Sequence, residues 1–307
     1  MIKGSEEPSK ENYSTVSISK DVTLEGWSGI FITHENYKAH GILVNINGTI
    51  KALDDTSGGP GAGIYVNGNI QHENNSPIIN LTNTSKITST GNGIYSAGYA
   101  TYNINGSYIE GIESALGIKS GVFNIKNCTI IGTGDDKTPT NGNNNGINPS
   151  GTAIQIESNK NYKGNIELNI ESGKIESKKS YTIYEYTVNN SNTQVKNINL
   201  TGGTYISPSN KSVFSLSDSF KSIHQNFISG GTYTTNPEQY LKNDYKTNIT
   251  KDDKYEVLHV FKEITETTQN NNQKENNHIL KITIIILSII LISSIIYLLK
   301  KKIFIIL

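Results

Sequence analysis

The chain has 307 residues, enough for one large domain or two ordinary ones, and its 27 basic and 27 acidic residues leave no net charge at pH 7. Every basic residue apart from histidine is lysine, and without arginine the chain lacks the side chain that most often reads guanine, so we expect no nucleic-acid partner. The single cysteine, Cys128, excludes an internal disulfide and a cysteine-rich metal site.

The first segment, residues 1–20, is polar, and we expect it to be disordered. It contains no apolar run of the kind that a secretion signal requires. Two explanations stay open: the true start lies upstream of Met1, or the protein is tail-anchored with its bulk in the cytoplasm.

Residues 21–235 repeat two short phrases, and they predict an all-β fold, a parallel β-helix (β-solenoid) of about seven coils. One phrase alternates apolar residues with asparagine before a turn, as in VNINGTI from Val44 and YNINGSYI from Tyr102. The other places a small residue before an apolar run, as in GIYV from Gly63. Alternation with a period of two indicates strands, and glycine or asparagine suits the corners between them. Seven coils stacked at ~4.8 Å would make a rod of ~35 Å.

The repeats also predict which side chains stack along the rod. We expect one residue to mark each turn: Ile42, Ile64, Ile94, Ile118, Ile154, Ile183 and Val213. An inward column should contain Ile46, Ile104, Ile125, Ile170 and Leu200. Their asparagine neighbours would face outward as an amide ladder, unless asparagine is merely abundant here: Asn45, Asn103, Asn124, Asn169 and Asn199. Cys128 shares a turn slot with Ser107, Gly173 and Gly203, which predicts a small turn residue rather than a nucleophile.

Residues 131–151 are rich in glycine, asparagine and proline, and they predict a loop pushed out of one coil. In solenoids such loops often carry the binding face. Asp135 and Asp136 are the candidate metal ligands, for calcium, because calcium prefers carboxylate and carbonyl oxygens; the alternative is a solvated turn. The candidate ligand-binding residues are these two aspartates with Asn143, Asn144 and Asn145. No other cofactor is expected.

Three segments resemble the β-helical repeats of a family of bacterial surface proteins of Firmicute and mollicute type: GIYSAGYATYNINGSYIEG, ALGIKSGVFNI and CTIIGTG. The segment from Ile228 to Leu258, which contains GGTY and PEQYL, is similar to the closing segment of that family. The resemblance covers about residues 41–258 and implies a surface-displayed parallel β-helix, often tethered at its C-terminus, with no assigned chemistry. We therefore expect residues 236–261 to cap the last coil with a short helix and a hairpin.

The remaining residues predict a membrane anchor. Residues 262–281 are polar and read as a disordered stalk. Residues 282–299 are uncharged and, at about 1.5 Å per residue, would span roughly 27 Å as a transmembrane helix, the alternative being a buried core helix. Lys300, Lys301 and Lys302 follow, so residues 300–307 should be cytoplasmic and the bulk outside, in a single-pass plasma-membrane protein.

Parallel β-helices include polysaccharide lyases and hydrolases, so an enzyme has to be considered. Lyase-like sites use clustered acidic residues with a basic residue that is usually arginine, and this chain has no arginine. Hydrolase-like sites need an Asp-Asp pair followed by His-Gly, whereas His40 and Gly41 precede Asp54 and Asp55. We predict a non-catalytic, adhesin-like protein that binds a glycan or protein of a host or neighbouring cell. A carbohydrate-binding or lyase-like β-helix and a passive spacer are the alternatives.

Overall fold

The computed structural model describes residues 13–33, 41–54, 61–68, 74–137, 151–159, 161–162, 164–188 and 194–260. They all belong to one compact unit, Met1–Val260, while the other unit, Phe261–Leu307, lies outside them. The predicted stalk and transmembrane helix therefore fall outside the described residues, as do Asn143, Asn144 and Asn145. Within the described ranges, no helix has both the length and the apolar character needed to cross a bilayer.

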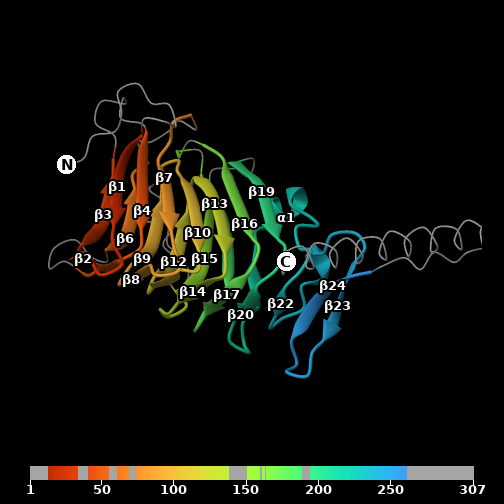
Figure 1. The fold of residues 1–307 in the computed structure, drawn as a ribbon. Helices are drawn as coiled ribbons and strands as arrows, with labels where there is room; N and C mark the ends of the chain where they lie inside the picture. The colour runs from red at the N-terminus through yellow and green to blue at the C-terminus, as the bar shows by residue number, and fades with distance from the viewer. Residues whose placement is uncertain are drawn as a thin grey trace, which may run out of the picture. The chain divides into compact units, whose positions relative to one another are not determined.

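Three sheets of parallel strands run along the unit, and each coil gives one strand to each sheet (Figure 1). The first sheet contains β1 (Ser14–Ile18), β4 (Ile42–Ile46), β7 (Ile78–Leu81), β10 (Thr101–Asn105), β13 (Gly121–Lys126), β16 (Ile166–Ile170) and β19 (Val195–Leu200). The second contains β2 (Thr23–Gly26), β5 (Thr49–Ala52), β8 (Lys86–Ser89), β11 (Tyr108–Gly111), β14 (Cys128–Gly132), β17 (Gly173–Ser177) and β20 (Thr204–Ile206). The third contains β3 (Ser28–Ile32), β6 (Ala62–Val66), β9 (Asn92–Ser96), β12 (Ser114–Ile118), β15 (Thr152–Asn159), β18 (Ile183–Val188) and β21 (Phe214–Ser215).

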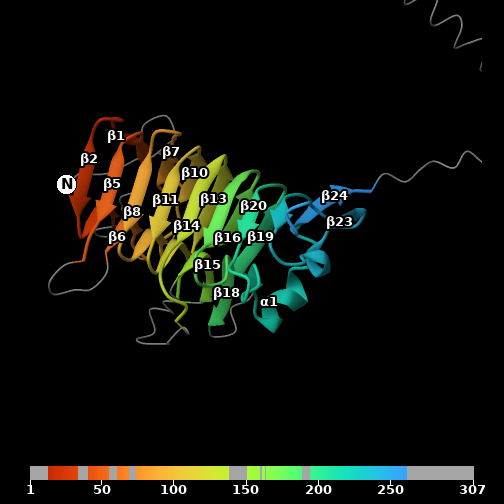
Figure 2. The same ribbon diagram turned by 90° about the horizontal axis from the view of Figure 1, so that it is seen from below.

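This order confirms the predicted β-solenoid, with seven coils in the part of the chain that the structure describes. Figure 2 shows strands β2, β5, β8, β11 and β14 of the second sheet side by side in chain order. Strand β1 begins at Ser14, so the first coil starts inside the segment for which disorder was expected. In the sequence STVSI, Val16 and Ile18 lie on the less exposed face and Thr15 and Ser17 on the exposed one, and this strand pattern outweighs the polar character of its surroundings.

The core consists of apolar columns in which each side chain sits on its counterpart one coil away. The predicted inward column is confirmed, because all five of its residues are at most 1% exposed and are paired in register. Ile18 and Leu81, which the repeat phrases had not marked, complete it in the first and third coils. Each coil alone would leave its inward face in water, so burial depends on stacking.

Among the predicted turn markers, Ile42 is wrong, while Ile118 and Val213 lie in the expected coils but outside the register that the other markers share. Ile42 lies in the first sheet, and the third-sheet residue of the first coil is Ile30. The column is Ile30, Ile64, Ile94, Leu116, Ile154, Ile183 and Phe214, so Leu116 replaces Ile118 and Phe214 replaces Val213. Residues two apart in a strand share a face, and therefore the alternation alone does not distinguish Leu116 from Ile118.

The C-terminal end departs from the coil pattern. Strand β22 (Thr232–Tyr233) pairs parallel with β20, after which β24 (Tyr255–His259) and β23 (Tyr245–Ile249) add an antiparallel hairpin. A short 3-10 helix (Glu238–Tyr240) lies between them in sequence. The rings of Tyr205 and Tyr233 stack with centroids 4.6 Å apart, which continues the core into this end. The hairpin pairs with β22, the last parallel strand of the second sheet, and so covers an edge that would otherwise be open.

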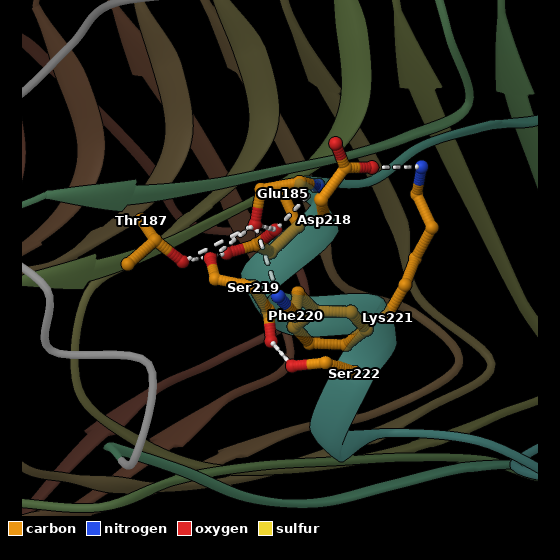
Figure 3. Close-up of polar contacts among 8 residues, drawn as sticks. Glu185, Thr187, Asp218, Ser219, Phe220, Lys221 and Ser222 are labelled. Carbon is orange, nitrogen blue, oxygen red and sulfur yellow. Dashed lines mark hydrogen bonds and ion pairs between the residues drawn. The ribbon is translucent and has the colours of Figure 1, made fainter.

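Helix α1 (Asp218–Ile223), which we had not predicted, is fixed to the third sheet by a buried carboxylate (Figure 3). Glu185 on β18 is 2% exposed and accepts hydrogen bonds from the backbone N–H of Ser217 at 2.9 Å and from its hydroxyl at 2.6 Å. Thr187 donates to the other carboxylate oxygen at 2.7 Å. Ser217 also caps the helix by accepting from the N–H of Phe220, whose ring is buried. The buried charge is therefore satisfied within the protein.

Candidate functional site

An outward row of asparagines runs along the first sheet, as the repeats predict. Each Nδ2 donates to the Oδ1 of the preceding rung at 2.9–3.1 Å, through Asn45, Asn80, Asn103, Asn124, Asn169 and Asn199. The predicted ladder is thus confirmed, with Asn80 as an additional rung. The Nζ atom of Lys242 donates to the Oδ1 of Asn199 at 3.4 Å and ends the row.

The amide groups keep hydrogen-bonding capacity beyond the ladder. An asparagine side chain has two N–H donors and two acceptor positions on its oxygen. Asn103 and Asn124 each use one donor and one acceptor along the row, and both side chains are exposed. Each of these rungs therefore presents one further donor and one further acceptor to the surroundings, repeated at the spacing of the strands, ~4.8 Å.

The ladder lies between two different columns of outward residues. On one side are partly exposed side chains, mostly apolar up to the fifth coil and polar after it: Leu43, Ile78, Thr101, Val122, Glu167 and Asn197. On the other side Asn105, Lys126 and Glu171 follow one another, and Lys126 and Glu171 form an ion pair at 2.9 Å. This pair is internally neutralised, so the face from β4 to β13 has amide and apolar character, while Glu167 adds a carboxylate beside Asn169.

A shallow groove of about 240 Å³ follows the ladder over three coils. Its lining residues are Asn103, Ile104, Asn105, Asn124, Ile125, Lys126, Asn169 and Glu171. Small-molecule sites usually bury most of the ligand in a closed cavity. This groove is open, so it suits a polymer that lies along the sheet better than a compact ligand.

The two predicted calcium ligands each pair with a different lysine. Lys179 forms an ion pair with Asp135, with Nζ and Oδ1 2.6 Å apart, and its hydrogen bond lowers the pKa of the Asp135 carboxyl. Asp136 pairs with Lys211 and accepts a 2.8 Å hydrogen bond from the Ser180 hydroxyl. Burial acts to raise the pKa of Asp136, but these two hydrogen bonds outweigh it and lower that pKa.

These contacts leave Asp135 and Asp136 poorly placed to share one cation. In the described part of the chain, no three histidine, cysteine, aspartate or glutamate side chains gather as a metal site would require. A calcium ion at the aspartates would have to displace Lys179 and Lys211 or recruit oxygens from outside the described residues. The structure instead uses the two carboxylates to tie the fifth coil to the sixth and seventh.

Cys128 occupies the turn slot that the repeats predict. It is 2% exposed, and its register partner one coil on is Gly173. Its thiol donates to backbone oxygens of Ile104 at 3.2 Å and Lys126 at 2.9 Å. Burial raises the pKa of the thiol, so less of the nucleophilic thiolate forms at neutral pH. The position is structural.

An aromatic column on the outward face of the third sheet is a weaker candidate for binding sugar rings. Phe31, Tyr65 and Tyr95 lie one above another, with ring centroids 5.1 Å and 4.9 Å apart. The neighbouring rings are tilted by 34° and 31° and contact each other, so part of each face is occupied by the next ring. A sugar ring binds to the face of an aromatic ring, so this column offers less binding surface than its three rings suggest.

Comparison of the chain with protein-family models, with curated proteins and with solved structures finds no match.

Proposed function

We propose that this protein is a non-catalytic, surface-displayed solenoid that binds an extended neutral polysaccharide along the amide ladder of the first sheet. The observation that carries the proposal is the row of six aligned outward amides, at least two of which keep a free donor and acceptor. A polymer parallel to the axis would meet the same pair of groups at each coil.

The chemistry of the face favours neutral sugars over acidic ones. Sugar hydroxyls both donate and accept, and an amide offers both functions on one side chain. The apolar column beside the ladder can cover the C–H faces of sugar rings. No row of unpaired lysines accompanies the ladder, since Lys126 is paired with Glu171 and Lys242 ends the row. Each contact would be weak, but one polymer would make the same contact at several coils, and together these contacts would raise its affinity.

We further propose that the solenoid is held outside the cell by the segment at residues 282–299. The support is its apolar, uncharged sequence and the three lysines after it. The resemblance to bacterial surface proteins supports the same placement. Protease treatment of intact cells should release the solenoid, and a solenoid that stays intact until the cells are lysed would contradict outside exposure.

Binding of the full chain to a panel of neutral and acidic polysaccharides tests the glycan proposal. The double variant Asn103→Thr, Asn124→Thr keeps polar residues that favour strands but removes two amides. We expect its affinity for the bound neutral polysaccharide to fall about tenfold, since losing two weak hydrogen bonds costs on the order of 1.4 kcal/mol. Binding that is unchanged in this variant would refute the role of the ladder.

A matched control is the variant Thr88→Ala, Thr129→Ala. Both threonines face outward from the second sheet, on β8 and β14, so the control changes an equivalent surface away from the ladder. It should bind like the unmodified protein. Calcium-dependent cleavage of an acidic polysaccharide would favour the lyase-like alternative instead.

A further inference from the structure

A lysine and a glutamate are buried together on the outward side of the third sheet. Lys119, which follows β12, is 1% exposed, and Glu157 on β15 is fully buried. Ile118 pairs with Ile156, so the two charged residues come next in register, and Nζ lies 3.1 Å from Oε2. The ammonium nitrogen is also 5.0 Å from the ring centroids of both Tyr95 and Tyr162.

The second oxygen of the same carboxylate holds a buried carboxamide. Asn159 is fully buried, and its Nδ2 donates to Oε1 of Glu157 at 3.0 Å. Its Oδ1 accepts a 3.0 Å hydrogen bond from the backbone N–H of Asn161. Its own backbone N–H donates to the side chain of Gln194 at 2.8 Å, which fixes the position of the residue. One carboxylate thus contacts both an amine, through Oε2, and a carboxamide, through Oε1.

These three groups are the components of an amide-forming reaction. A lysine amine is a nucleophile, a carboxamide is an acyl group with ammonia as its leaving group, and a carboxylate transfers protons between them. We propose that Lys119 and Asn159 become joined by an intramolecular isopeptide bond, that Glu157 is the acid and base for its formation, and that one ammonia molecule is released.

The reaction balances without any added reagent. Lys119 first gives a proton to Glu157, which converts the ion pair into an amine and a carboxylic acid. Nζ then attacks Cγ of Asn159, the Nζ–Cγ bond forms, and the negative charge collects on Oδ1. The backbone N–H of Asn161 already donates to that oxygen and stabilises the charge. Glu157 takes a second proton from Nζ as it gives one to Nδ2; the Cγ–Nδ2 bond breaks and ammonia leaves.

The burial of the three groups favours both the reaction and its product. An ion pair removed from water carries a desolvation cost, and forming the amide removes that pair. Lys119, Glu157 and Asn159 are at most 1% exposed, with two tyrosine rings near Nζ, and this burial limits the water that would compete for the acyl group. The product places a neutral amide where the ion pair was. It also joins neighbouring coils covalently in a chain whose single cysteine allows no internal disulfide.

Peptide mapping of the purified full chain by mass spectrometry tests the proposal directly. Trypsin does not cleave after an acylated lysine, so the linked product should be residues 87–126 joined to residues 138–160, lighter than their sum by one ammonia. Recovery of free residues 87–119 together with residues 138–160 carrying an intact Asn159, and no joined product, would overturn it. This measurement uses the unmodified protein, so it does not depend on whether any variant folds.

Three variants assign the roles. Lys119→Arg and Glu157→Gln should abolish the joined peptide, and Lys126→Arg, at an exposed lysine of the same tryptic fragment, should retain it. Asn159→Asp should give the same amide with loss of water in place of ammonia. An ammonia loss that persists in Lys119→Arg would come from another site, such as an Asn-Gly succinimide, and would contradict the assignment.

Discussion

The stacked rings in the middle of the solenoid predict a large loss of stability when one of them is removed. Phe123 is fully buried in the fifth coil, and its ring lies 4.2 Å from that of Tyr102 in the coil before, at an interplanar angle of 14°. Its partner in the coil after is Leu168. Phe123→Ala leaves a cavity between the neighbouring coils, which cannot both move to fill it. We therefore expect the free energy of unfolding to fall by about 3–5 kcal/mol.

This cost should appear as a thermal midpoint lower by about 6–20 °C, because 1 kcal/mol corresponds to about 2–4 °C in a unit of this size. Coils contact mainly their neighbours, and therefore amide exchange of the full chain should accelerate most in β10, β13 and β16. The control is Val122→Ala, one residue earlier and facing outward, which should cost less than about 1 kcal/mol. Equal shifts for the two variants would refute the stacked-column account.

Three other predictions concern single positions. Gly121 has φ of 106°, and a Cβ there would lie 2.5 Å from a backbone oxygen. Gly121→Ala should therefore lower the free energy of unfolding in urea by about 1–3 kcal/mol. The control is Gly26→Ala, whose Cβ has space, and an equal loss of stability in both variants would contradict the prediction. The Cys128 thiol should react with a thiol reagent only after unfolding, and rapid reaction of the native protein would disagree. Burial and the hydrogen bond donated to Glu110 raise the pKa of Tyr108 to about 12, so its phenol should stay largely protonated above pH 10. Glu110→Gln should lower that pKa in an NMR titration. An unchanged pKa would count against the hydrogen bond.

The tyrosine shift also fixes the direction of a pH effect on stability. The pKa of Tyr108 is raised from 10.0 in the folded chain, so between pH 10 and 12 the folded state binds more protons than the unfolded one. The free energy of unfolding should therefore fall as the pH rises through this window.

The repeat phrases predicted the fold because the residues at their strands and corners are specific to stacked coils. Asn103 and Asn124 recur at one place in a phrase, so their position in a ladder followed from the spacing. Asn80 was missed since its phrase, IINLTN, lacks the glycine turn of the others, although its alternation with Ile79 and Leu81 was a usable signal. Helix α1 was missed because six residues carry little periodicity, with only Ser217 before Phe220 to indicate a cap.

The buried Lys119 and Glu157 were beyond sequence reasoning for a different reason. They are separated by the insertion that begins after β14, and taking Ile118 instead of Leu116 as the turn marker displaced the register by two residues. In that displaced register Lys119 is not opposite Glu157. The partners of Asp135 and Asp136 depend in the same way on coils that follow the insertion, so the lysines that neutralise them could not be assigned from spacing.

The amide ladder has a polarity. Every rung donates toward the N-terminal coils, so the side-chain dipoles of the row add head to tail, as peptide dipoles add in a helix. The ammonium of Lys242 sits at the oxygen end, where a positive charge is favourable. A polymer whose two ends differ chemically therefore has two non-equivalent orientations on this face, and the protein would hold such a chain in one preferred sense.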